Sequence, residues 1–306
     1  MENLIAKLSE QKGITLRQNA PMREYTTFQI GGPARLLIEP ESVDALVSCY
    51  RILTENAVVP LVIGAGSNLL VSDKGIPGVV IRLAKSMSRI EIDGEYITAE
   101  AGVSLARLAT EALSAGLSGL EFAGGIPGSL GGAVFMNAGA YGGEMKDVIV
   151  ETTYLSKDGT VATVSGEEHA FGYRHSFFSE KGGIVLSARM KLTPKNPEEI
   201  RATMKELSTR RRDKQPLNFP SAGSFFKRPE GHFAGKLIED AGLKGTTFGG
   251  AQISEKHAGF VINTGGATAK DVCLLMDFVT EKVQTLYGVT LEPEVRMLGD
   301  FSDILQ

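Results

Sequence analysis

The sequence predicts an α+β protein, and three observations support this prediction. Amphipathic helical patterns alternate with short apolar strand patterns along most of the 306 residues. Two separate segments, 61–73 and 124–143, are rich in Gly and poor in large polar side chains. The composition, with 42% hydrophobic and 22% charged residues, is that of an ordinary folded chain.

In the first half of the chain, caps and turns mark the expected elements. A short helix at the start ends at Gly13, a second helix follows the cap Ser42, and a third runs from the cap Ser104 to Gly116. Asp93-Gly94 is typical of a hairpin turn. The strands expected between these helices are 35–39, 59–63, 78–83, 89–92 and 96–100.

The second half begins with strands over 147–165, turning at Lys157-Asp158-Gly159, and continues with a strand at 183–192. The polar segment TPKNPEE (193–199) is typical of a linker. Helices are expected at 198–212, 233–241 and 269–286. The chain is therefore predicted to divide into a lead-in helix (1–27), a ligand-binding domain (28–194) and a smaller α+β domain (200–306).

The two Gly-rich segments indicate what that domain binds. Gly permits positive φ and close approach of the backbone to a ligand, and exposed main-chain N–H groups attract anions. Two such loops favour one large ligand with a pyrophosphate in its middle, which is a dinucleotide. A side chain at Gly66 or Gly128 is then expected to block its binding. A Rossmann fold is disfavoured, because GAGSNL (64–69) lacks the third Gly and no helical pattern follows it.

Bulk properties exclude several other classes. The net charge of −4 gives no general attraction to nucleic acid or to an anionic membrane. No apolar run is long enough for a signal core or a membrane span, so a cytoplasmic location is expected. Cys49 and Cys273 lie in helical patterns and are expected to be buried free thiols. The four His residues show no metal-ligand spacing, and no metal is expected.

Three polar clusters remain, at 172–178, 221–229 and 291–296. Each one alone is better explained by a surface turn with a salt bridge. Together they supply an Arg, a Ser hydroxyl, a Lys and a carboxylate. This combination suits an anionic substrate that must receive a proton.

At these positions the chain resembles a known family, the UDP-N-acetylenolpyruvoylglucosamine reductases. The matching blocks follow one another in family order over nearly the whole chain: YTTFQIGGPA (25–34), GAGSNLLVSDKGIPGVVI (64–81), GGIPGSLGGAVFMNAGAYGGE (124–144), GYRHSFF (172–178), PSAGSFFKRP (220–229), KLIEDAGLKG (236–245) and LEPEVRMLG (291–299). The short spacing between the GYRHSFF and GSFFKRP blocks resembles the shorter, second type of the family. Arg228 stands where many relatives carry Asn.

The resemblance implies a fold and a reaction. The fold is the vanillyl-alcohol-oxidase (PCMH) type, in which two subdomains hold non-covalent FAD and a smaller α+β C-terminal domain binds the substrate. The reaction is the NADPH-dependent reduction of the enolpyruvyl ether of UDP-N-acetylglucosamine to UDP-N-acetylmuramate in peptidoglycan synthesis. The expected partners are these small molecules, with neither nucleic acid nor membrane, and the expected state is a monomer.

Roles for individual residues follow from the same resemblance. Arg174 is expected to stabilise charge on the substrate carboxylate, Ser224 to act as general acid, and Glu294 to complete the site. The substrate-binding residues are expected to be Tyr141, Tyr173, Lys214, Lys227 and Arg228. The FAD-binding residues are expected to be Gly64, Ala65, Gly66, Ser67, Asn68, Leu69, Gly124, Ile126, Pro127, Gly128, Ser129, Gly132, Asn137, Gly139 and Ala140.

Two other functions are compatible with the same fold pattern. One is an FAD-dependent sugar or alcohol oxidase, although the Gly-rich segments contain no His or Cys for a covalent flavin link. The other is a nucleotide-sugar binding module without catalysis. A flavin absorption band that NADPH bleaches and sugars do not bleach would separate the reductase from both.

Overall fold

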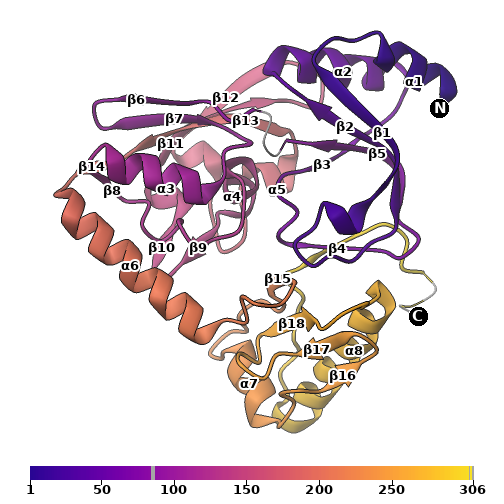
Figure 1. The fold of residues 1–306 in the computed structure, drawn as a ribbon, viewed down its shortest axis with the longest axis vertical. Coiled ribbons are helices and arrows are strands. Elements are labelled where there is room, and N and C mark those ends of the chain that lie inside the picture. The colour runs from indigo at the N-terminus through magenta and orange to yellow at the C-terminus, as the bar shows by residue number, and fades with distance from the viewer. Residues whose placement is uncertain (84–86, 303, 305–306) are drawn as a thin grey trace. The chain divides into compact units, whose positions relative to one another are not determined.

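The computed structural model describes residues 1–83, 87–302 and 304, and the chain folds into two compact units, whose elements are labelled in Figure 1. Unit 1 comprises Met1–Arg17, Leu37–Ala65 and Val79–Arg210. Unit 2 comprises Gln18–Leu36, Gly66–Gly78 and Arg211–Gln306. The chain therefore passes between the units several times.

Unit 1 contains a five-stranded sheet in the order β12-β11-β13-β7-β6, with antiparallel pairing throughout. The helix α4 packs against β13 and β7. The strands are β6 (Ile90–Asp93), β7 (Tyr96–Glu100), β11 (Ile149–Leu155), β12 (Val161–Ser165) and β13 (Ile184–Lys191). The expected hairpin at Asp93-Gly94 and the turn at 157–159 are confirmed.

Two helices of unit 1 begin at the predicted caps. Ser42 Oγ accepts a hydrogen bond from Ala45 N at 3.1 Å, and Ser104 Oγ accepts one from Arg107 N at 3.3 Å. Each bond satisfies one of the N–H groups that the first helical turn leaves without a partner. The helices of unit 1 are α1 (Glu2–Ser9), α2 (Val43–Glu55), α3 (Leu105–Ser114), α4 (Leu130–Met136), α5 (Phe177–Lys181) and α6 (Pro197–Lys214), whose last turn lies in unit 2.

Further strands form a second sheet and two short strand pairs. A four-stranded sheet has the order β1-β2-β5-β3, in which β3 and β5 are parallel. Its strands are β1 (Ile14–Pro21), β2 (Pro33–Pro40), β3 (Leu61–Ile63) and β5 (Ile76–Arg82). Two short pairs join β9 (Gly139–Ala140) to β10 (Gly143–Glu144), and β8 (Leu117–Ser118) to β14 (Thr193–Pro194). Three 3-10 helices are η1 (Met22–Glu24), η2 (Met145–Asp147) and η3 (Gly166–His169).

Unit 2 is a four-stranded sheet in the order β15-β18-β17-β16, packed against the long helix α8, which also contacts α7. Its core joins residues from distant parts of the sequence, among them Phe28, Leu70, Phe225, Val272 and Val279. The elements are β4 (Leu69–Val71), β15 (Ser221–Ser224), α7 (Ala234–Asp240), β16 (Thr247–Phe248), β17 (Ala251–Ile253), β18 (Phe260–Asn263), α8 (Ala269–Tyr287) and β19 (Arg296–Leu298).

The compact units differ from the consecutive domains that the sequence predicts. Residues 18–36 and 66–78 belong with the C-terminal part of the chain, because specific bonds hold them there. Asn263 Nδ2 donates to Phe28 O at 3.2 Å, and β4 pairs in parallel with β19. The assignment of separate ligand-binding and substrate-binding roles to 28–194 and 200–306 stays a prediction.

Two local predictions need correction. The segment 193–199 is not a linker, because Thr193–Pro194 forms β14 and Pro197 begins α6, a position that suits a residue without an N–H. The helix α4 was not predicted, because Gly131 and Gly132 lower its intrinsic propensity. Burial of Leu130 and Val134 and a 2.9 Å bond from Gly131 N to Ala101 O stabilise it instead. Within the described residues, no helix is both long and apolar enough to cross a membrane.

Both cysteines are buried free thiols, as predicted. Burial raises the pKa of Cys49 and of Cys273 to about 12. Thiol reagents need the thiolate, and a rise in pKa from 9.0 to about 12 lowers the thiolate fraction at pH 8 roughly a thousandfold. We therefore expect both thiols to react roughly a thousandfold more slowly in the native protein than in the denatured chain. A colorimetric thiol assay with and without denaturant measures this ratio. Rapid labelling of the native protein would contradict the burial.

Asp73 caps helix α8 from a distant part of the sequence. Its carboxylate accepts hydrogen bonds from Ala269 N at 2.8 Å and from Lys270 N at 3.0 Å, and its charge complements the positive end of the helix. We expect Asp73→Ala to lower the free energy of unfolding by about 1–2 kcal/mol. Asp73→Asn retains one oxygen acceptor, so its free energy of unfolding should lie between those of the unchanged protein and Asp73→Ala. Urea unfolding measures the series, and equal stability of all three proteins would exclude this capping role.

Candidate active site

The first Gly-rich segment follows β3 and meets the second one within unit 1. A Cβ atom on Gly64 would overlap Ser129 Oγ, so only Gly allows the two loops to come this close. The Ser129 side chain is 3% exposed, and its Oγ is a buried polar atom without a hydrogen-bond partner in the protein. A buried hydroxyl without a partner is unfavourable unless a ligand supplies one. The Ser129 hydroxyl is therefore available to a polar group of a bound ligand.

The continuation of this segment, Gly66–Leu69, lies in unit 2, and its FAD contacts stay a prediction. Gly66 has φ +70°, and a Cβ atom there would overlap the carbonyl oxygen of Tyr25. A side chain at Gly66 would therefore disturb this packing as well as any ligand contact, so it does not test ligand binding alone. Asn68 Nδ2 donates to Glu294 O at 3.2 Å, which ties the segment to a predicted catalytic residue.

The second Gly-rich segment is anchored to unit 1 by its backbone. Leu105 N donates to Gly128 O at 3.0 Å, and Leu130 N donates to Val103 O at 2.8 Å. Gly124 and Gly139 are both packed against neighbouring atoms that a Cβ would crowd. The predicted cofactor residues of unit 1 thus lie along two loops and α4: Gly64, Ala65, Gly124, Ile126, Pro127, Gly128, Ser129, Gly132, Asn137, Gly139 and Ala140.

Tyr173 and Arg174 form the two-residue tip of a small hairpin in unit 1. Gly172 and His175 form an antiparallel bridge, with Gly172 N to His175 O at 3.0 Å. Arg174 has φ +54°, a left-handed conformation that is unusual for a long side chain. Its guanidinium lies over the Tyr173 ring, 5.1 Å from the centroid. Such outliers concentrate at functional sites, which is in keeping with the role predicted for Arg174.

Ser224 and Glu294 lie on neighbouring segments of unit 2. Ser224 ends β15, directly after Gly223, whose φ of +81° accompanies a register shift between β15 and β18. This irregularity changes the direction in which the following side chain points. Glu294 N donates to Phe225 O at 2.8 Å, and Phe226 bridges to Pro293. The predicted acid and carboxylate are therefore brought onto adjacent extended segments.

The predicted substrate residues have specific partners. Lys227 Nζ forms a salt bridge with Glu292 at 3.0 Å. The Arg228 guanidinium lies over the Phe233 ring at 4.1 Å, and that of Arg210 lies over Tyr141 at 5.0 Å. Lys214 is exposed at the end of α6. Arg174, Tyr141 and Tyr173 belong to unit 1, whereas Lys214, Ser224, Lys227, Arg228 and Glu294 belong to unit 2.

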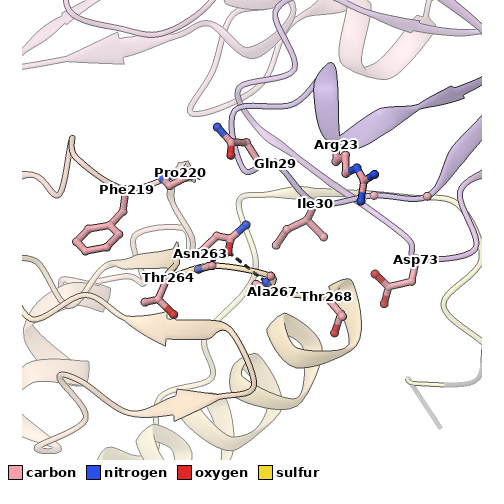
Figure 2. A pocket seen from close by; sticks show the side chains of 14 residues that line it. Arg23, Gln29, Ile30, Asp73, Phe219, Pro220, Asn263, Thr264, Ala267 and Thr268 are labelled. Atoms are coloured by element: carbon pink, nitrogen blue, oxygen red, sulfur yellow. Dashed lines mark hydrogen bonds between the residues drawn. The ribbon is translucent and has the colours of Figure 1, made fainter.

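Unit 2 contains a cavity of about 620 Å³ that was not predicted from the sequence (Figure 2). Arg23 and Gln29 line it from one segment, and Asn263 and Thr268 from another. Asn263 Oδ1 accepts from Gly265 N at 2.9 Å and from Ala267 N at 3.2 Å, which fixes the Gly265-Gly266 turn that lines it. The signal in the sequence was the Gly-rich block QIGG (29–32), which lines this cavity.

Comparison with known proteins identifies the relatives of this chain. The family described as UDP-N-acetylenolpyruvoylglucosamine reductase, C-terminal domain, matches residues 215–298, and the FAD binding domain family matches 34–165. The chain is 52% identical to the UDP-N-acetylenolpyruvoylglucosamine reductase of Agathobacter rectalis, covering 98% of this chain and 99% of that protein. The chain is also 49% identical to the reductase of Caldanaerobacter subterraneus, covering 98% of this chain and 99% of that protein. The crystal structure of the Thermus caldophilus reductase has a TM-score of 0.80 at 39% identity and covers 94% of this chain and 99% of that one.

The residues present fit FAD, the cofactor of this fold. The buried Ser129 hydroxyl, which has no partner among the described residues, would offer a hydrogen bond to an FAD diphosphate or ribityl group. The predicted PCMH-type fold class is confirmed. The individual FAD contacts stay predictions.

A steric test addresses the Ser129 contact. Gly64→Ala forces Ser129 Oγ out of its place, and we expect this change to weaken FAD binding by roughly 2- to 12-fold, the value of one hydrogen bond. Ser129→Ala removes the same oxygen, and its Cβ then lies 3.5 Å from the new methyl group at position 64, which is an ordinary contact. The double variant Gly64→Ala/Ser129→Ala should therefore bind FAD no more weakly than either single variant.

Fluorescence titration of the apoprotein with FAD measures these affinities, and thermal melting of the apoprotein checks folding. Gly78→Ala is the matched control, because nothing lies within 4 Å of a Cβ at that position. Additive losses in the double variant, or unchanged affinity in Gly64→Ala, would exclude the Ser129 contact.

Proposed function

The chain belongs to the UDP-N-acetylenolpyruvoylglucosamine reductase family, and we propose that Arg174, Ser224 and Glu294 carry out the reaction of that family in this protein. The protein is an FAD-dependent oxidoreductase that reduces the enolpyruvyl ether of UDP-N-acetylglucosamine to UDP-N-acetylmuramate with NADPH, a step of peptidoglycan synthesis. The observation that supports the residue assignment is the pairing of the Ser224 and Glu294 segments, together with the unusual backbone of Arg174.

The chemistry requires two additions across one double bond. Bound FAD supplies the hydride, taken from NADPH, to the terminal carbon of the enolpyruvyl group. Negative charge then develops on the neighbouring carbon and spreads into the substrate carboxylate. The Arg174 guanidinium stabilises this charge, because a fixed cation in a partly desolvated site stabilises an anion far better than water does. The double bond becomes a single bond when the second carbon receives a proton.

Ser224 donates that proton to the carbon bearing the ether oxygen. A Ser hydroxyl is a weak acid, so its surroundings must favour the transfer. Ser224 is exposed in the structure, so the bound substrate and cofactor would have to exclude water from it. Glu294 completes the site from the adjacent segment.

Substrate recognition is proposed for the remaining polar residues. Tyr141, Tyr173, Lys214, Lys227 and Arg228 bind the UDP-sugar, and the binding energy of the remote diphosphate orients the enolpyruvyl group. When the substrate binds, Lys227 breaks its ion pair with Glu292 and binds a substrate oxygen instead. Breaking the ion pair costs little free energy, because exposed ion pairs contribute little to stability.

We also propose that the enzyme works as a cytoplasmic monomer without nucleic-acid or membrane partners. Two buried free thiols are in keeping with a reducing compartment. Light scattering of the purified protein tests the monomer, and a dimer mass would exclude it.

Ser224→Ala tests the assignment of the general acid. We expect flavin content and flavin reduction by NADPH to stay within about twofold of the unchanged protein, since neither step needs this proton. Reoxidation by the enolpyruvyl substrate should slow by roughly 10²–10⁴-fold. Stopped-flow flavin absorbance separates the two half-reactions. Ser221→Ala, a Ser-to-Ala change in the same strand, is the control and should leave both rates unchanged.

The opposite pattern, slow reduction by NADPH with normal reoxidation by substrate, would remove Ser224 from the role. Glu294 or a bound water would then deliver the proton.

A further inference from the structure

We propose that Asn137 is a positioning residue that sets the orientation of Arg174 through the backbone of the Gly172–His175 hairpin. This inference rests on the role proposed above for Arg174. It differs from the sequence-based expectation, which assigned Asn137 to FAD. Three features support it: the hydrogen bonds of the buried Asn137 amide to protein partners, the strain of the hairpin, and the attachment of that hairpin to one end of α4.

Both amide hydrogens and the amide oxygen of Asn137 bond to protein partners. The residue is 0% exposed. One amide hydrogen goes to Glu144 Oε2 at 2.9 Å and the other to Gly172 O at 3.0 Å. The amide oxygen accepts from Lys146 N at 2.9 Å. An amide has only two hydrogens, so none remains for a cofactor. Its polar atoms therefore serve to hold neighbouring chain segments in place.

The segment that Asn137 holds needs outside support. The hairpin of Gly172 and His175 has only two bridging backbone bonds, of 3.0 and 3.2 Å, and a two-residue tip. At that tip Arg174 has φ +54°, where Gly or Asn is favoured and a long side chain is disfavoured. Such a conformation persists only where the surrounding structure holds it. The bond from Asn137 to Gly172 O acts on the first residue of this turn.

A second bond attaches the other end of the hairpin to the same place. Ser176, which is 0% exposed, donates from Oγ to Phe135 O at 2.7 Å. Phe135 and Asn137 are two residues apart at the C-terminal end of α4. Both ends of the hairpin are thus fixed to the end of α4, which packs on the central sheet of unit 1. The guanidinium of Arg174 takes its direction from this attachment.

Asn137 is itself left-handed, with φ +43°, so the choice of variant matters. Asn137→Gly keeps this conformation without strain and removes only the side-chain bonds. Asn19→Gly is the matched control, because Asn19 is an exposed Asn with φ +52°. We expect Asn137→Gly to lower the rate of flavin reoxidation by the enolpyruvyl substrate by about 10- to 100-fold, as expected for a misplaced catalytic group. Flavin content and reduction by NADPH should stay within about twofold of the unchanged protein.

A double-mutant cycle with Arg174→Ala tests whether Asn137 acts through Arg174. In the Arg174→Ala background, Asn137→Gly should have almost no further effect on reoxidation, because the group it orients is gone. Full additivity of the two losses would overturn the proposal. So would loss of flavin in Asn137→Gly, which would restore the cofactor role, and so would lower thermal stability with unchanged rates, which would indicate a purely structural role.

The outcome for Arg174→Ala alone keeps the two hypotheses distinct. If this variant is reoxidised at the rate of the unchanged protein, the proposed function of Arg174 fails. If Arg174→Ala is slow and Asn137→Gly is not, the catalytic assignment stands and only the positioning inference fails.

Discussion

The parallel pairing of β4 with β19 is the interaction on which the organisation of unit 2 depends. It adds residues from the first quarter of the sequence to a unit built mainly from the last third, and it begins where the first Gly-rich segment ends. Arg296 N donates to Asn68 O at 3.0 Å, and Asn68 Nδ2 donates to Glu294 O at 3.2 Å. A residue predicted to bind FAD therefore fixes the backbone of a residue predicted to complete the active site.

A similar arrangement exists in unit 1. Asn137, from the second Gly-rich segment, donates to Gly172 O, two residues before Arg174. In both units an Asn amide joins a Gly-rich segment to a segment that carries a proposed catalytic residue. Amide side chains suit this task, because they donate and accept at once and carry no charge that burial would penalise. Changes in the Gly-rich segments can thus alter catalytic residues as well as the cofactor site.

Glycine has two different uses in these segments, and the sequence does not distinguish them. At Gly64 the approach is between two loops beside an unpartnered Ser129 hydroxyl, which suits a ligand. At Gly66 the approach is to the Tyr25 carbonyl, which is internal packing. Both need the absence of a Cβ, and both produce the same GAG pattern. Only the identity of the nearby atoms decides which use applies.

The sequence by itself determined the α+β class, the two N-caps Ser42 and Ser104, two hairpin turns, the two buried thiols and, through its resemblance to a family, the cofactor and reaction. These depend on short-range signals such as Ser42, Ser104 and Asp93-Gly94, or on motifs that are read residue by residue. Only the tertiary structure decided that residues 18–36 and 66–78 belong with the C-terminal part, that 193–199 is β14 and the start of α6, and that α4 forms despite its glycines. Each of these depends on partners far away in sequence, such as Asn263 for Phe28 and Ala101 for Gly131. Local propensity contains no information about such partners, because the energy that selects them comes from contacts formed only when the chain has folded.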